Sequence, residues 1–290
     1  MTSLQNKIDF AIVLRVNHAN PNGDPLNGNR PRTDYEGLGE ITDVCLKRKL
    51  RDRLLEAGQP IFVQSDDRKV DEFRSLAERA KGVLGEKLGG AETAERACAE
   101  WFDVRAFGQL FAIKAGTKPK KGEAGDDSAG DTGISIGIRG PVSIQSAFSL
   151  EPVSVTSTQI TKSVSGDGDG SKRGSDTMGM KHRVDRGVYV SYGSMNPQLA
   201  ERTGFSDIDA DLIKRILPKL FENDASSARP DGSMQTMTVV WWRHNCKAGQ
   251  HSAAKVHDSL RQLLQEDGSF DHALLRQSLA GLEPEIIEGF

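Results

Sequence analysis

The sequence has few cysteines and no long apolar run. Its three cysteines, Cys45, Cys98 and Cys246, are too few and too far apart for a disulfide framework or a cysteine-rich zinc site. No stretch approaches the roughly 18 consecutive apolar residues that a membrane-spanning helix needs. The first residues, MTSLQNKIDF, show no basic segment followed by an apolar one, so we expect no secretion signal. These absences predict a cytoplasmic protein that contacts no membrane.

The sequence also lacks the excess of basic residues that is common in nucleic-acid-binding proteins, because its formal net charge is −3. Basic residues are instead concentrated in two segments, which run from Val44 to Arg53 and from Ser171 to Arg186. Such segments can form a stripe that binds phosphates on an otherwise acidic surface. The alternative is ordinary solvent-exposed charge, and composition does not separate the two interpretations.

The N-terminal part of the chain predicts a strand, a long loop and a helix. Residues Ile8 to Val16 are β-branched and apolar, as in a buried strand. From Asn17 to Arg32 the chain contains two Asn-Gly pairs, an Asn-Pro and an Asp-Pro, which predict repeated turns outside regular structure. A helix is then predicted from Ile41 to Leu55, with Thr42 as its N-cap.

Three basic residues of this helix are predicted to lie close together. Lys47 and Arg51 are four residues apart and share a face, and Arg48 lies about 100° around the helix axis. The three side chains should therefore converge on one part of the surface. A solvated helix face is the alternative to a phosphate-binding one.

The rest of the chain alternates helical and strand-like segments, without an internal repeat at a period of about 20 to 50 residues. The segment 115–133 has no apolar periodicity and is predicted to be a surface loop. A long β-hairpin arm with a flexible tip is predicted over 153–186. Together the elements indicate one α+β domain over residues 1–290 with a mostly antiparallel sheet. Further helices are predicted at 71–88, 91–101, 205–223, 253–264 and 272–279. A strand or a broken hairpin is predicted at 134–147, and further strands at 188–192 and 237–242.

Five strings carry a resemblance to a known family. They are NPNGD (20–24), TDVCLKRKLR (42–51), FDVRAFG (102–108), GIRGPV (137–142) and TMGMKHRVDRGVYVSYGSMNP (177–197). In this order they resemble the CRISPR-associated Cas-seven family, and most closely its type I-C branch. The resemblance implies an α+β fold with a modified RNA-recognition-motif (ferredoxin-like) palm. It further implies helical finger insertions at 60–133 and a β-hairpin thumb at 153–186. The residues themselves predict a C-terminal helical segment at 250–290.

The resemblance implies a non-catalytic subunit of a type I-C Cascade surveillance complex. Copies of such a subunit stack head to tail along a CRISPR guide RNA (crRNA), which pairs with a target DNA strand in antiviral defence. The other partners implied are a guide-processing or capping subunit, a large subunit and a small subunit, and no cofactor or metal is expected. The RNA-binding residues assigned in this way are Asn22, Asn27, Arg30, Lys47, Arg48, Arg51, Gly137, Arg139, Gly140, Lys162, Met178, Lys181, His182 and Arg183.

Two groups of these residues have a specific role in the resemblance. Gly137 and Gly140 lack Cβ atoms, so backbone amides beside Arg139 can approach a phosphate closely. A plain turn at the end of a strand is the alternative. Met178 is the candidate for an apolar wedge beside a flipped nucleotide, while the basic residues of the thumb hold phosphates. The alternative for Met178 and Met180 is to fill gaps in a core.

Two enzymatic readings compete with this function. Asp24 and Asp34 lie in the loop after the predicted first strand. Related type III backbone proteins carry at this place an aspartate that cuts target RNA. The alternative function is therefore a metal-dependent endoribonuclease that uses Asp24. Asp24 also belongs to a turn in which aspartate is common for conformational reasons. His244 and Cys246 would share a face of a strand, as nucleophile and base or as metal ligands. No third group is evident beside them, so we expect core and edge residues.

Overall fold

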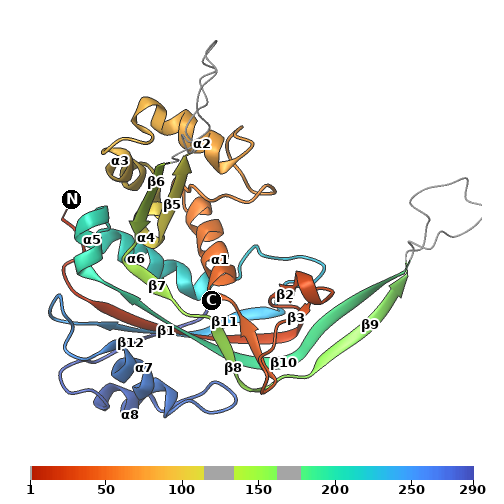
Figure 1. Cartoon of the computed structure of the whole chain (residues 1–290). Helices are drawn as coiled ribbons and strands as arrows, with labels where there is room; N and C mark the ends of the chain where they lie inside the picture. The colour runs from red at the N-terminus through yellow and green to blue at the C-terminus, as the bar shows by residue number, and fades with distance from the viewer. Residues whose placement is uncertain (1, 114–133, 162–177) are drawn as a thin grey trace, which may run out of the picture.

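The computed structural model describes residues 2–113, 134–161 and 178–290 (Figure 1). An eight-stranded sheet forms its centre, with the order β12-β11-β1-β10-β8-β4, and β7 and β9 also pair with β10. All of these pairings are antiparallel, which confirms the α+β class and the antiparallel sheet. The strands are β1 (Ile8–Ala19), β4 (Leu38–Ile41), β7 (Val142–Ile144), β8 (Ala147–Pro152), β9 (Val155–Thr161), β10 (Met178–Met195), β11 (Met234–Arg243) and β12 (Glu285–Glu288).

Strand β1 lies in the middle of the sheet, and both of its faces are covered. Phe10, Ile12 and Leu14 belong to the larger core cluster, on the face that carries α1 (Asp43–Glu56) and α6 (Asp207–Ile216). Ala11 belongs to a second cluster, on the face that carries α7 (Ala253–Arg261) and α8 (His272–Gln277). A strand buried on both faces needs a nearly continuous apolar run, which is why the sequence predicted this element well.

The helix caps follow the chemistry expected from the sequence. Thr42 Oγ1 accepts a hydrogen bond from the backbone of Cys45 at 3.3 Å, which confirms Thr42 as the N-cap of α1. Ser206 and Asp209 form a capping box at the start of α6. The helix predicted over 71–88 is shorter than expected, because it consists of α2 (Leu76–Leu84) and a 3-10 turn (Gly85–Lys87). Two further short helices are α5 (Pro197–Thr203) and the 3-10 turn Leu217–Lys219.

A smaller unit projects from the α1 face of the sheet, at the top of Figure 1. We call it the α2–β6 unit; it contains α2, α3 (Thr93–Glu100), α4 (Phe102–Phe107) and a two-stranded sheet of β5 (Gly108–Ile113) and β6 (Ile134–Arg139). Its own core packs Phe62 against Trp101 and Phe111. The loop predicted at 115–133 lies outside the described residues.

Two stretches contain regular structure that the sequence analysis did not predict. The loop 17–32 was expected to lack regular structure, which is wrong, because β1 continues to Ala19 and a small hairpin pairs β2 (Gly23–Asp24) with β3 (Arg30–Pro31) around a 3-10 turn (Pro25–Asn27). The C-terminal segment 250–290 was expected to be helical, yet β12 adds to the edge of the sheet beside β11. Strands β2, β3 and β12 are too short for their alternation to be recognised in the sequence.

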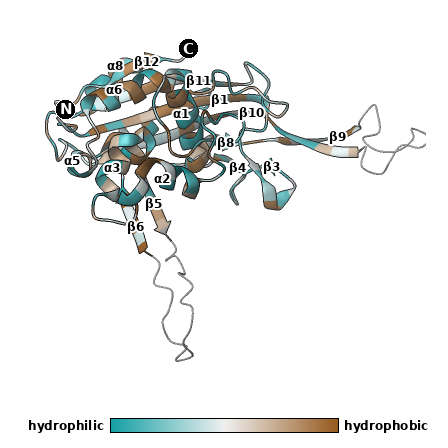
Figure 2. Cartoon of the chain, turned by 90° about the horizontal axis from the view of Figure 1, so that it is seen from above, coloured by the Kyte–Doolittle hydropathy of each residue, from teal (hydrophilic) through white to brown (hydrophobic). Residues whose placement is uncertain are grey.

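The predicted hairpin arm is present and leaves the body of the protein (Figures 1 and 2). Strand β9 pairs with the first part of β10, from Met178 opposite Thr161 to Val184 opposite Val155. The core strand predicted at 188–192 is the continuation of the same 18-residue strand. The helices in the described parts of the chain include none with the length and apolar character to span a membrane.

Candidate nucleic-acid interface

The basic residues of α1 are each paired with a carboxylate of the same chain. Lys47 Nζ lies 2.9 Å from Asp43 Oδ2, and its side chain is 24% exposed. Arg48 bonds through Nε to Asp52 at 3.0 Å and keeps 43% of its side chain exposed. The partly exposed pair of Lys47 and Asp43 contributes only about 0.3–0.5 kcal/mol, so another anion can replace Asp43 at little cost. Asp52 is buried, so Arg48 stays bonded to it and can meet a ligand only with its exposed atoms.

Arg51 differs from these two residues. Its Nε donates to Asp103 Oδ2 at 2.9 Å, and its side chain is only 13% exposed. Asp103 is buried and also accepts hydrogen bonds from the backbone amides of Phe62 and Val63. Arg51 therefore joins α1 to the α2–β6 unit. The expectation that Arg51 lies with Lys47 and Arg48 on one free basic surface is wrong, because burial commits it to Asp103.

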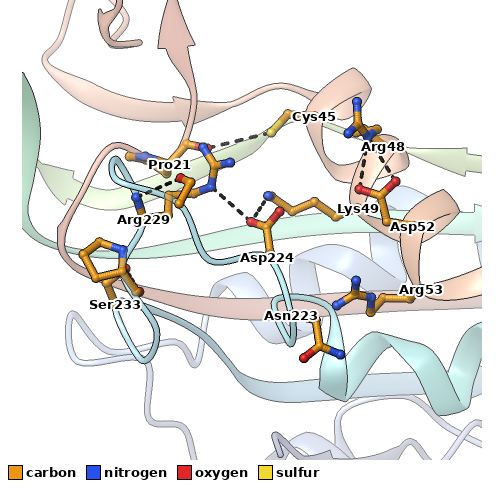
Figure 3. A network of polar contacts seen from close by, with 12 residues as sticks. Pro21, Cys45, Arg48, Lys49, Asp52, Arg53, Asn223, Asp224, Arg229 and Ser233 are labelled. Carbon is orange, nitrogen blue, oxygen red and sulfur yellow. Dashed lines mark hydrogen bonds and ion pairs between the residues drawn. The ribbon is translucent and has the colours of Figure 1, made fainter. Parts of the chain in front are cut away.

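The sequence analysis did not single out Lys49, another basic residue of α1. Lys49 is buried and forms an ion pair with Asp224, which also accepts from Arg229 Nε at 3.0 Å (Figure 3). Burial lowers the pKa of Lys49. Beside it, burial raises the pKa of Cys45, whose Sγ donates to the carbonyl of Pro21. This network fixes the loop after β1 and the loop before β11 against α1.

Two loop residues that the sequence analysis singled out have structural partners: Asn22, assigned to RNA binding, and Asp24, the candidate residue of the alternative function. Asn22 Oδ1 accepts from the amide of Thr42 at 3.0 Å and from its hydroxyl at 2.8 Å, so it fixes the loop to the first turn of α1. Asp24 Oδ1 accepts from the amide of Leu26 at 3.2 Å and lies 3.3 Å from Arg32 Nη2. Asn27 is exposed at the end of the same turn. The conformational role considered for Asp24 thus has a concrete basis in its contacts.

Arg30 connects the β2–β3 hairpin to the arm. Its Nη1 donates to Ser157 Oγ at 3.0 Å, and the same hydroxyl lies 2.8 Å from His182 Nδ1. Ser157 and His182 face each other across β9 and β10. Two of the assigned residues, Arg30 and His182, are therefore brought together by a serine that the sequence analysis did not single out.

The pairing register decides which arm residues share a face. Side chains alternate along a strand, so Met178, Met180 and His182 lie on the same face as Val184. Val184 is fully buried in the core cluster on the α1 side of the sheet. Met178 and Met180 are 63% and 55% exposed, so the interpretation of these residues as fillers of a core is wrong.

The remaining basic residues of the arm lie on its other face. Lys181 and Arg183 alternate with His182 and point away from the α1 side. Arg183 Nε also lies 3.4 Å from Asp185 Oδ1. The expectation of one combined cluster of thumb residues is therefore corrected to two faces of different chemistry. Lys162 lies outside the described residues.

The glycine turn has an explanation within the chain. A Cβ atom at position 140 would lie 2.3 Å from the carbonyl oxygen of Ala106 and 2.5 Å from the amide nitrogen of Gly108. Glycine at position 140 is thus required by packing against α4 and β5, as in the alternative of a plain turn at a strand end. At Gly137 the nearest atom would be 3.9 Å away, and Arg139 is exposed at the end of β6.

His244 belongs to a buried polar network, and a third group beside it does exist. Its Nε2 donates to Asp9 Oδ2 at 2.8 Å, its Nδ1 accepts from the amide of Gln250 at 2.8 Å, and both side chains are fully buried. Burial acts to raise the pKa of Asp9, but hydrogen bonds from His244, Ser194 and Lys7 outweigh it and leave that pKa below its ordinary value. The missed partner was Asp9. The network lies inside the fold, as expected for a core histidine.

Comparison with known proteins places the chain in a family. One antiparallel sheet with a projecting helical unit and a long arm defines an α+β protein, and the family model described as CRISPR-associated protein Cas7 matches residues 6–271. The chain belongs to this family. The CRISPR-associated protein Cas7 of Haloferax volcanii is 31% identical over 237 residues, which cover 78% of this chain and 67% of that protein.

A solved structure has a similar fold. It is a chain of a "CRISPR RNA-guided surveillance complex, pre-nicking", which superimposes with a TM-score of 0.50 at 13% identity. The match covers 94% of this chain and 87% of the other. At this identity the likeness describes the fold alone.

Proposed function

We propose that this chain is a crRNA-binding backbone subunit of a type I-C Cascade surveillance complex. The main sheet would be the RNA-recognition-motif-like palm, the α2–β6 unit the fingers and the β9–β10 arm the thumb. One observation carries the proposal: the exposed face of the arm with Met178 and His182 is connected by Arg30 to the β2–β3 hairpin. Asn22 then connects that hairpin to the N-terminus of α1.

This connected surface suits an RNA strand. Lys47 can exchange the partly exposed carboxylate of Asp43 for a phosphate, whereas Arg51 cannot leave Asp103 without a cost of about 3–5 kcal/mol. Arg48 stays bonded to the buried Asp52 and can reach a phosphate with the exposed part of its guanidinium. The exposed thioether of Met178 can pack beside an unstacked base, because it is flexible and polarisable. The guide would thus run from α1 across the β2–β3 hairpin to the arm.

The proposed partners follow from this role. Copies of the chain would stack head to tail along the guide, and the exposed bases would pair with a target DNA strand. A guide-processing or capping subunit, a large subunit and a small subunit would complete the complex. The protein would act in the cytoplasm.

The first experiment measures RNA carried by the purified protein. Expressed together with a CRISPR array, the chain should purify with an excess absorbance at 260 nm that ribonuclease removes. Protein free of RNA under these conditions contradicts the proposal and favours the alternative of a scaffold protein that binds no nucleic acid.

We also propose that the subunit is non-catalytic. This is supported by Asp24, whose carboxylate caps a turn and contacts Arg32. The test is incubation of the assembled complex with labelled complementary RNA and Mg²⁺. Regularly spaced cuts that disappear in Asp24→Asn would establish the endoribonuclease alternative instead.

A further inference from the structure

A fully exposed aromatic side chain lies at one edge of the main sheet. Tyr35 has its whole side chain in solvent, on the turn 33–37 that enters the edge strand β4. Asp34 Oδ1 accepts from the amides of Glu36 and Leu38, both at 2.9 Å, so the turn is held in one shape. A large ring on a rigid turn loses little entropy on binding, which is typical of an anchor residue in a protein interface. We call residues 33–37 the Tyr35 turn.

The Tyr35 turn is acidic. Asp34, Glu36 and Glu40 lie on it or beside it, and none of these three forms an ion pair within the described part of the chain. Acidic groups on both sides of Tyr35 repel phosphates, so a nucleic acid is a poor partner for this turn. A partner with an apolar site and basic groups at its rim fits better.

A groove of this kind lies at the opposite edge of the same sheet. It has a volume of about 850 Å³ and lies between α6 and the edge strand β12. Its apolar side chains include Ile208 and Phe290, which are 63% and 69% exposed, and Ile287. We call it the β12 groove. Apolar side chains gathered around one exposed groove indicate an interaction site.

The unpaired charge of the β12 groove is mainly positive. Lys214 and Asp211 also line it, but they are already paired with Glu285 and Arg243. Arg215 and Lys219 are exposed and, among the described residues, have no carboxylate within ion-pair distance. One lining carboxylate, Glu288, is likewise unpaired within the described chain. Among the described side chains that line it, the groove therefore offers two free cations against one free anion.

We propose that the Tyr35 turn of one copy of this chain docks in the β12 groove of the next copy. The ring would pack against Ile208 and Phe290, and Glu36 would approach Arg215. Strands β4 and β12 end the same sheet on opposite sides, so a chain cannot make this contact with itself. Each added copy leaves one free turn and one free groove, and such a contact builds an open filament. It would be an anchor within an interface of roughly 800 Å² per partner.

The inference rests on the proposed head-to-tail stacking and is tested with two variants at exposed positions. The turn variant carries Tyr35→Ala and Glu36→Lys, and the groove variant carries Ile208→Asp and Arg215→Glu. On a synthetic single-stranded RNA with room for several copies, wild-type protein should form a ladder of complexes in mass photometry. Each variant alone should need about tenfold more protein for the second copy to bind.

Mixing the variants is decisive, because one intact turn then meets one intact groove. The mixture should form pairs and no longer complexes. If either variant alone assembles like the wild type, or if the mixture forms no more pairs than each variant alone, the docking is wrong. Glu36→Lys and Arg215→Glu, placed together in one chain, should recover part of the assembly that is lost when either of these two substitutions is made alone. Lys255→Glu, at an exposed lysine of α7, is the control and should assemble normally.

Failure of the docking can be told apart from failure of the proposed function. Affinity for a short RNA that holds one copy should be the same in both variants and in the wild type. If the wild-type chain binds no RNA, the proposed function fails. Docking is then judged in concentrated RNA-free mixtures by sedimentation, where pairs formed only by the mixture support it and their absence overturns it.

Discussion

Arg51 Nε lies 2.9 Å from Asp103 Oδ2, across the boundary between α1 and the α2–β6 unit. Asp103 is fully enclosed, and its other hydrogen bonds come from the backbone before α2. The guanidinium thus supplies the opposite charge that this buried carboxylate requires. The pair separates two functions on one helix, because Arg51 holds the fold together while Lys47 and the exposed part of Arg48 remain open to a ligand.

Substitutions on α1 should therefore have different effects. Lys47→Ala should weaken RNA binding for all guide sequences and reduce the slope of log affinity against log salt by about 0.7, the value for one phosphate of a single strand. Its folding free energy should change by less than about 0.5 kcal/mol. Fluorescence titrations at several salt concentrations measure the slope, with Lys255→Ala as the control. An unchanged slope would remove Lys47 from the interface.

Arg51→Ala should act on stability instead. Leaving Asp103 buried without its partner should lower the free energy of unfolding by about 3–5 kcal/mol in urea titrations. A variant that is as stable as the wild type but binds RNA weakly would show that Arg51 contacts the guide after all.

Gly137, within β6, and Gly140, just after it, form a matched pair. Gly140→Ala should lower the unfolding free energy by about 1–3 kcal/mol, because the new Cβ would overlap the backbone at Ala106. Gly137→Ala should stay within about 0.5 kcal/mol, since its Cβ would meet no atom closer than 3.9 Å. Thermal unfolding of both variants measures the difference. Equal stability of the two would contradict the packing explanation.

Ser157 should set the orientation of the arm. In Ser157→Ala the hydroxyl between Arg30 and His182 is lost, so hydrogen exchange of the arm amides should become about threefold to tenfold faster. Thr158→Ala, on the other face of β9, is the control and should exchange like the wild type. If both variants exchange alike, the connection to Arg30 does not hold the arm.

Acidification should loosen the packing of α7 on the sheet. His257 Nε2 donates to the carbonyl of Gly193 at 3.2 Å, beside Asp9, and burial lowers the pKa of His257 from its ordinary 6.5. A lowered pKa means that the neutral form stabilises the fold above about pH 6.5, and this contribution is lost as the pH falls. Asp9 also has a lowered pKa, so its contribution persists until the pH falls below about 4.

Urea titrations at about pH 7.5 and about pH 5.5 measure this effect. The wild type should lose stability between the two, and His257→Gln should lose less. His272→Gln, at an exposed histidine of α8, should behave like the wild type. If His257→Gln loses as much as the wild type, the pH dependence has another source.

Local chemistry explains which elements the sequence revealed. The apolar run of β1, the cap at Thr42 and the alternation of β6 and β7 before the arm each depend on neighbours within a few residues, and all three are found in the structure. The short strands β3 and β12 are stabilised by partners elsewhere in the chain, so their own residues carry no clear pattern.

The family strings and the basic character of α1 were therefore readable from the sequence alone, because they are properties of adjacent residues. Which cations remain free was decided by tertiary structure. Asp103 is 52 positions from Arg51 and Asp224 is 175 positions from Lys49, and no local pattern predicts pairs so distant. The division of the arm into a face with Met178 and a face with Lys181 likewise depends on the pairing register. Charge is a property of the sequence, but its availability to a ligand depends on what folding brings beside it.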